Sequence, residues 1–203
     1  MHFNNLNWYE IIELSYLEDL KTLFEETQRT WKSNLDEIGE EIDRLDEEDK
    51  DEYVDYHYDI IIQMRETLPR ITNNSILINI YSFFEVQMID FYNDVKSKLS
   101  SDVNARHLTD KLNYLNESFG SEVVTKDEIA QLDFVRELRN RIMHSNGVIE
   151  KKDFTELVNK IEECSHIKLS DRKEIILDND FIIKLFEIVE DVLRNLNRCV
   201  KSL

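Results

Sequence analysis

Apolar residues recur every three or four positions along most of the chain, which is the spacing of amphipathic helices. Between residues 6 and 45 this pattern predicts one long helix, or two in line, with Gly39 as a weak point. The segment Asp43–Asp59 is strongly acidic and predicts a solvated turn between helices. Apolar positions resume at Ile60, and Pro69 is expected to stop that helix because the residue before a proline disfavours helical backbone.

The most apolar stretch of the chain follows, because residues 71–84 carry no charge. Asn74 or Ser75 is expected to cap a helix here that is apolar on most sides, and such a helix should be central. Glu85 is the first charge after this stretch. We therefore expect a buried carboxylate at Glu85, which needs a partner, and an arginine from elsewhere in the chain is the natural one.

The second half of the chain predicts shorter elements with clear end signals. Each of these elements is bounded by capping or turn residues. They are a helix over 107–119 that ends at Gly120, a helix capped by Thr125 or Asp127 with Glu128 early in it and ended by Asn146-Gly147, a helix from Asp153 to about Ser165, a small β-hairpin from His166 to Asp178, and a last helix from Asp180.

Composition agrees with this helical interpretation, since the chain has only three glycines and one proline and so little of the turn chemistry that sheets need. We predict an all-α helical bundle with long N-terminal helices and a small β-hairpin near 166–178. A chain of 203 residues suits one domain over 1–203, with an N-terminal helical extension over 1–68 and a core over 70–200.

The formal net charge of −18 argues against general binding of polyanions, so any nucleic acid must be held at a local basic site. The acidic segment lacks the Asp-x-Asp-x-Asp-Gly pattern of a calcium loop, and we interpret it as a solvated face; no metal or cofactor is expected. No membrane contact is expected, because fourteen uncharged residues fall short of the roughly 18 that a spanning helix needs. Met1–Glu10 shows no signal peptide, and two cysteines, Cys164 and Cys199, suggest no disulfide framework, so a cytoplasmic protein is expected.

Candidate chemistry gathers in residues 134–147, FVRELRNRIMHSNG. Arg136, Arg139 and Arg141 lie within six residues there and form the strongest local positive charge in the sequence. His144 falls in the last turn before Gly147, where helix-end carbonyls favour an imidazolium by roughly 0.3–1 kcal/mol. Fixed positive charge beside a group that exchanges protons near neutral pH is what an acid–base site for phosphate chemistry needs.

The run Arg139-Asn140-Arg141-Ile142-Met143-His144 resembles the R-x4-6-H motif of the HEPN superfamily, in its frequent form of Arg-Asn, three residues, then His. The resemblance extends in pattern over residues 70–200, but only the six-residue motif is specific. It implies a helical bundle, usually dimeric, and many such proteins are metal-independent ribonucleases of toxin–antitoxin, abortive-infection and RNA-decay systems. One subgroup is controlled by modification of a tyrosine two residues after the histidine; this chain has Asn146 there, so that control is not carried over.

The resemblance implies attack of an RNA 2′-hydroxyl on the adjacent phosphate, with no metal. His144 would transfer the proton, Arg139 would stabilise charge on the phosphoryl oxygens, and Asn140 would orient His144 or the phosphate. Arg136 and Arg141 would bind flanking phosphates, or simply face solvent, and Glu85 would support Arg139 or His144, or satisfy another buried donor.

Helix geometry adds a constraint, because five residues at 100° each put Arg139 and His144 about 140° apart. A long arginine side chain can reach around the helix, or a two-fold dimer can place the arginine of one subunit beside the histidine of the other. The dimeric habit of the family favours the second solution, so a homodimer with the site at its interface is expected. An antitoxin or defence-system protein is a further expected partner.

Three other interpretations stay open. The arginines can be an exposed cluster with a capping histidine, which has no catalytic role. The fold can also be a non-catalytic module that senses a nucleotide or a partner protein, or a structural scaffold built on the long N-terminal helix. RNA cleavage in the presence of a chelator separates catalysis from all three.

Overall fold

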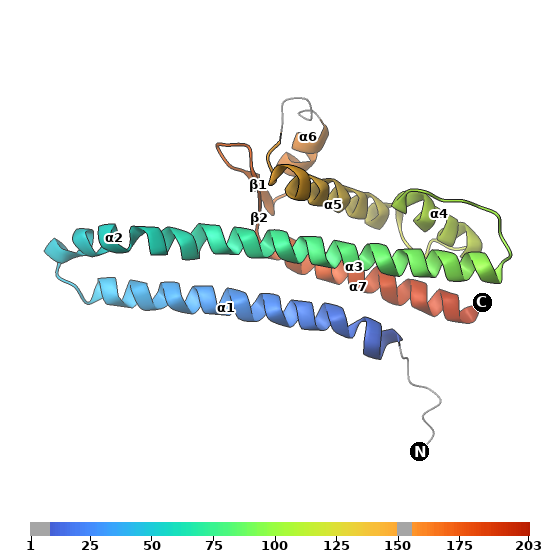
Figure 1. The fold of residues 1–203 in the computed structure, drawn as a ribbon, viewed down its shortest axis with the longest axis horizontal. Coiled ribbons are helices and arrows are strands. Elements are labelled where there is room, and N and C mark those ends of the chain that lie inside the picture. The colour runs from blue at the N-terminus through green and yellow to red at the C-terminus, as the bar shows by residue number, and fades with distance from the viewer. Residues whose placement is uncertain (1–8, 150–155) are drawn as a thin grey trace, which may run out of the picture.

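One unbroken helical run forms the spine of the molecule in the computed structural model, which describes residues 9–149 and 156–203. It consists of α2 (Glu47–Ile62), the π-helix η2 (Gln63–Thr67) and α3 (Leu68–Lys98), as Figure 1 shows. The expectation that Pro69 stops a helix is wrong. Pro69 lies in the first turn of α3, directly after the π turn, where the Leu68 N–H donates five residues back to the Gln63 carbonyl. The widened turn accommodates a residue that has no N–H to give.

The expected helix start at Asn74 or Ser75 is wrong for the same reason, since both residues lie inside α3. The neighbouring Asn73 is buried, and its side-chain amide donates to the Leu177 carbonyl at 2.9 Å and to Asn179 Oδ1 at 3.1 Å. The residue before the two predicted caps therefore joins α3 to the C-terminal part of the chain.

The N-terminal elements are η1 (Tyr9–Glu13) and α1 (Ser15–Asp43), and α1 runs antiparallel to the spine without a break at Gly39 (Figure 1). The predicted solvated turn over Asp43–Asp59 is wrong in extent, because only residues 44–46 separate α1 from α2. Three acidic residues, Glu47, Glu48 and Asp49, fill the first turn of α2. Negative charge there is favourable beside the unpaired N–H groups of a helix N-terminus, which explains why an acidic run forms helix.

The last helix, α7 (Asn179–Ser202), packs along α3 and completes the core with α1. Asp178 caps it, with its Oδ1 accepting from the Phe181 N–H at 2.9 Å. The central position predicted for the apolar helix is confirmed, because α3 contributes more buried residues than any other described helix. Its fully shielded hydrophobic residues include Leu77, Ile80, Tyr81, Phe84, Met88 and Val95.

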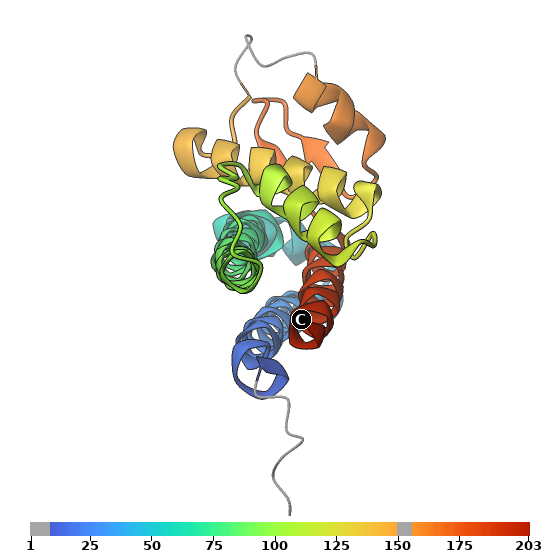
Figure 2. The same cartoon turned by 90° about the vertical axis from the view of Figure 1, so that its right-hand side faces the viewer.

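A second layer covers α3 and α7, as the end-on view of Figure 2 shows. It contains α4 (Leu108–Phe119), α5 (Lys126–Ser145), α6 (Glu156–Glu163) and the antiparallel pair β1 (Ile167–Leu169) and β2 (Ile175–Leu177). The predicted all-α bundle with a small hairpin is thus confirmed. The expected helix start at Asp153 lies outside the described residues.

The C-terminal end of α5 is fastened to the hairpin. Asn146 has φ 50° and Gly147 has φ 77°, a conformation that favours glycine, and they end the helix as predicted. The Ile175 N–H then donates to the Gly147 carbonyl at 2.9 Å, and the Ile149 N–H donates to the Lys173 carbonyl at 3.0 Å. These bonds fix the end of the helix that carries the candidate motif.

Within the described ranges, every helix is too short or too polar to cross a membrane. Cys164 and Cys199 are free thiols, each partly exposed.

Candidate functional site

Helix α5 brings the motif to the contact between the two layers. A capping box fixes its start, because the Thr125 hydroxyl accepts from the Glu128 N–H at 3.2 Å while the Glu128 carboxylate accepts from the Thr125 N–H at 2.7 Å. The buried side of α5 holds apolar residues that face the core. They are Ile129, Leu132, Val135, Leu138 and Ile142. The polar motif residues flank this buried side, so α5 holds them along the edge of its packing with α3.

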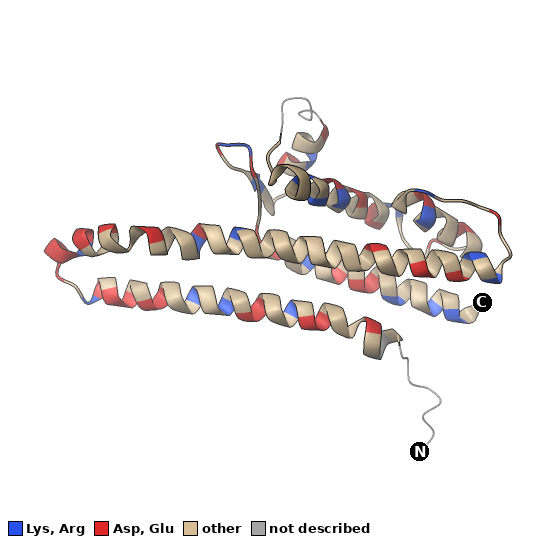
Figure 3. Cartoon of the chain, in the orientation of Figure 1, with Lys and Arg blue, Asp and Glu red and all other residues tan. Residues whose placement is uncertain are grey.

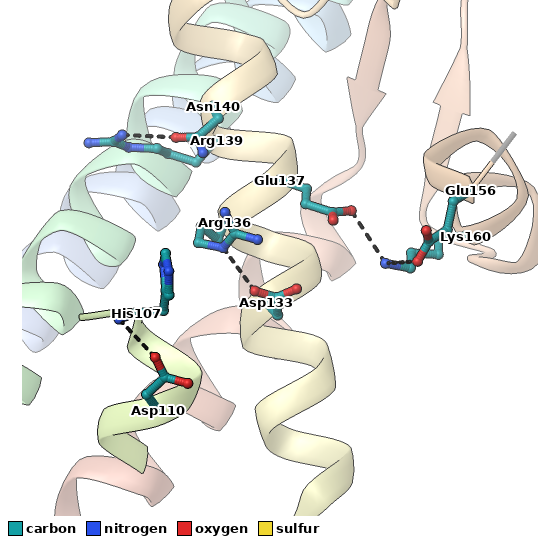
Figure 4. Close-up of polar contacts among 9 residues, drawn as sticks. All are labelled: His107, Asp110, Asp133, Arg136, Glu137, Arg139, Asn140, Glu156 and Lys160. Carbon is teal, nitrogen blue, oxygen red and sulfur yellow. Dashed lines mark hydrogen bonds and ion pairs between the residues drawn. The ribbon is translucent and has the colours of Figure 1, made fainter. Parts of the chain in front are cut away.

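Arg139 is the best-held member of the motif, with a side chain that is 23% exposed. Figure 4 shows its guanidinium extending from α5 toward α3. Nη1 donates to Asn140 Oδ1 at 3.1 Å, and Nη2 lies 4.0 Å from Glu85 Oε2. Nε is shielded from solvent and has no acceptor among the described residues. The guanidinium is therefore fixed in direction, although its donors are only partly used.

Glu85 faces Arg139, which is the kind of partner expected for it. The expected burial of Glu85 is wrong, because its side chain is 40% exposed. Position 85 lies where the buried side of α3 meets its open side, and the fourteen uncharged residues before it do not reveal that boundary. Glu85 thus reaches Arg139 from the edge of the α3–α5 contact.

His144 lies in the last turn of α5, as predicted, and is exposed. Its side chain makes no hydrogen bond or ion pair with any residue that the structure describes. Asn140 was expected to orient either His144 or a phosphate, but its side-chain oxygen accepts from Arg139 instead. Within one chain the guanidinium of Arg139 is directed toward α3 while His144 stays open, in keeping with the helical offset of about 140°.

The arginine cluster is less positive than the sequence indicates. Arg136 Nε donates to Asp133 Oδ1 at 2.8 Å, and this hydrogen bond raises the pKa of Arg136 above its ordinary value. Figure 4 shows the ring of His107 beside Arg136 and places Glu137 on another side of α5, where its carboxylate lies 3.4 Å from Lys160 Nζ. Arg141 is half-buried near the helix end. Carboxylates thus accompany the arginines and offset part of their positive charge.

Two residues of this region were missed by the sequence reasoning, Asp133 and Tyr81. Tyr81 is completely buried in α3, and its hydroxyl has no hydrogen-bond partner among the described residues. Burial raises the pKa of the Tyr81 hydroxyl above its ordinary value, and the nearby Glu85 carboxylate adds to that shift. A signal was available, because Tyr81 precedes Glu85 by four residues and so shares its side of a helix.

We expect Tyr81→Phe to raise the free energy of unfolding by about 1 kcal/mol, because it removes a buried hydroxyl that has no partner. Urea unfolding followed by circular dichroism measures the difference. A loss of stability would show that the hydroxyl makes a hydrogen bond in solution and helps to hold the α3–α5 contact.

One group of described residues offers donor atoms for a metal ion, and it lies outside the motif. His166 Nδ1 is 3.1 Å from Asp178 Oδ2 and 3.9 Å from Asp180 Oδ2. The ammonium of Lys184 lies 2.7 Å from His166 Nε2, and Asp178 already caps α7. Because the Lys184 ammonium occupies one side of the His166 imidazole, we interpret the arrangement as a polar network that joins the hairpin to α7.

Comparison of the chain with protein-family models, with curated proteins and with solved structures finds no match.

Proposed function

We propose that this protein is a metal-independent endoribonuclease of the HEPN type that acts in the cytoplasm as a toxin or phage-defence effector. The observation that carries the proposal is Arg139, whose guanidinium is held by Asn140 and by packing against α3. Its Nε has no acceptor among the described residues, and it lies five residues before the exposed His144. Preorganised positive charge beside an accessible proton-transfer group is what phosphoryl transfer needs.

In the proposed reaction the 2′-oxygen of a ribose attacks the adjacent phosphorus while the bond from phosphorus to the 5′-oxygen breaks. The imidazole of His144 takes the proton from the 2′-hydroxyl as the new bond closes a 2′,3′-cyclic phosphate. The imidazolium then gives this proton to the leaving 5′-oxygen, which ends as a hydroxyl. Arg139 donates hydrogen bonds to the nonbridging oxygens as their charge grows. Asn140 positions Arg139, Glu85 restrains it from the α3 side, and Arg136 and Arg141 are candidates for contact with flanking phosphates.

A second copy of the chain would complete this site. The open side of α3 carries Ile71, Ile78 and Ile89, which fall within about 20° of one another around the helix. Ile71 and Ile89 are 53% and 46% exposed, and Met143, one residue before His144, is 48% exposed. An apolar stripe beside the motif suits a two-fold interface that sets Arg139 of one subunit near His144 of its partner.

The composite site predicts that two inactive proteins regain activity when mixed. We expect His144→Ala and Arg139→Ala each to be inactive alone, and an equimolar mixture after subunit exchange to reach about one quarter of wild-type activity. This fraction arises because half of the dimers are mixed and each mixed dimer has one intact pair. Cleavage of a fluorescent RNA measures the recovery.

Analytical ultracentrifugation accompanies this experiment and shows whether mixed dimers are present. A strictly monomeric protein, or mixed dimers without recovery, would contradict the composite site. Activity in a monomeric wild type would leave the ribonuclease proposal intact and place both residues in one chain.

A further inference from the structure

Most of the helical hairpin formed by α1 and α2 has no buried side chain: all of α2, and α1 after Phe24. From residue 25 to residue 72 no residue is buried, although the chain is helical through almost all of this described stretch. Phe24 before it and Asn73 after it are both buried. Figure 1 shows the reason. Helix α7 covers only one half of the long α1–α3 pair, and the other half, together with α2, extends past the N-terminus of α7.

A groove of about 1260 Å³ opens where α7 begins. Its walls are residues 28–36 of α1, residues 64–73 of η2 and α3, and residues 170–180 of the hairpin and the start of α7. Trp31, Leu35 and Met64 line it and are only half-buried. The indole Nε1 of Trp31 is shielded and has no acceptor among the described residues. The groove thus offers a small apolar patch in line with α7, set among walls that carry six acidic and five basic residues.

Beyond the groove, the two helices are strongly acidic. The acidic arm, residues 36–59, contains thirteen acidic and two basic residues, a net charge of −11. Figure 3 shows Asp and Glu positions, in red, on both α1 and α2 at this end of the molecule. Two such arms would repel each other, and RNA would be repelled for the same reason, so neither a second copy nor nucleic acid suits this end of the molecule.

We propose that the groove and the acidic arm together bind a basic amphipathic helix of a partner protein. The helix lies in line with α7, sets apolar residues against Trp31, Leu35 and Met64, and extends its basic residues over the acidic arm. It continues the packing that α7 makes with α1 and α3, which is a helix-in-groove mode of recognition. This proposal does not depend on ribonuclease activity.

A synthetic peptide tests the class of partner directly. The probe is a helix of roughly 18 residues built from leucine, lysine and glutamine with leucine on one face, and the same peptide with glutamate for lysine is its control. Trp8→Phe leaves Trp31 as the single tryptophan. We expect a blue shift of Trp31 emission with the basic peptide, at a dissociation constant of about 10 µM in low salt, and none with the acidic one.

Groove variants separate specific docking from general attraction between opposite charges. We expect Leu35→Gln with Met64→Gln to weaken binding at least about tenfold, since hot-spot contacts are apolar and central. Leu23→Gln with Leu99→Gln is the matched control, because these exposed leucines lie outside the groove. Far-ultraviolet circular dichroism verifies that each variant is folded.

Charge variants test the acidic arm without touching the apolar surface. Glu48→Gln, Asp51→Asn and Glu52→Gln remove three exposed charges from the arm and should weaken binding about fivefold, with a smaller dependence on salt. Three exposed carboxylates elsewhere provide the matched control, with the changes Asp102→Asn, Glu117→Gln and Glu163→Gln. Equal weakening by both triple variants, binding unaffected by the groove variant, or binding of the acidic peptide would each overturn the proposal.

Discussion

Replacing His144 by alanine is expected to reduce RNA cleavage by about 10²–10⁴-fold, because the change removes the group that we propose moves a proton in the transition state. The fold should be unaffected. His144 is exposed in the last turn of α5 and has no side-chain hydrogen bond within the described residues, so its loss removes no core packing. A fluorescent RNA assay in excess chelator gives the rate, and thermal unfolding gives the stability.

His57→Ala is the matched control, since His57 also lies on a helix but belongs to α2, where its Nδ1 lies 3.0 Å from the Tyr53 carbonyl oxygen. That variant should cleave RNA at the wild-type rate. If His144→Ala retained full activity, the ribonuclease assignment would be wrong. If the wild type left RNA intact, the result would favour the alternative function, a non-catalytic module that senses a nucleotide or a protein.

Arg139→Lys should lower the cleavage rate by about 10²-fold or more, although the charge is preserved. The guanidinium is planar, its Nη1 is held by Asn140, and its other nitrogens face the α3 side. An ammonium on a flexible stem cannot reproduce two directed donors to a phosphate. Single-turnover kinetics should show the loss in the chemical step, while RNA affinity changes little.

The chain provides its own control for this change. Arg194-Asn195 is the same dipeptide on α7, where Arg194 donates to Glu190 at 2.6 Å and 2.9 Å and no histidine follows at the motif spacing. Arg194→Lys should leave the rate unchanged. Wild-type activity in Arg139→Lys would show that Arg139 supplies only net positive charge.

Local signals were sufficient to predict the end of α4 and both ends of α5. The Thr125–Glu128 capping box, Gly120 with φ 61° and the pair Asn146-Gly147 are all recognised by their own residue types, because each satisfies helix-end groups within a few positions. Pro69 was misjudged because its effect depends on the turn before it. A π turn ahead of the proline cannot be read from the residues alone.

Only part of the candidate site could be predicted from the sequence. The sequence places Arg139, Asn140 and His144 on one helix, but their partners are decided by the packing of α5 on α3. Tertiary packing sets Glu85 at an edge, turns Asn140 toward Arg139 and buries Tyr81 beneath them. The contact between Glu85 and Arg139 has no local signature, since α4 separates α3 from α5 in the chain.

The bonds that fasten α5 to the hairpin also impose an order on biosynthesis. Helix α5 is synthesised before the residues that anchor its end. These residues are Ile175, whose N–H donates to the Gly147 carbonyl, and Lys173, whose carbonyl accepts from the Ile149 N–H. A nascent chain that has reached only Gly147 therefore carries the complete motif on a helix whose last turn is still unanchored. The turn that bears His144 therefore becomes fixed only after β2 has been made.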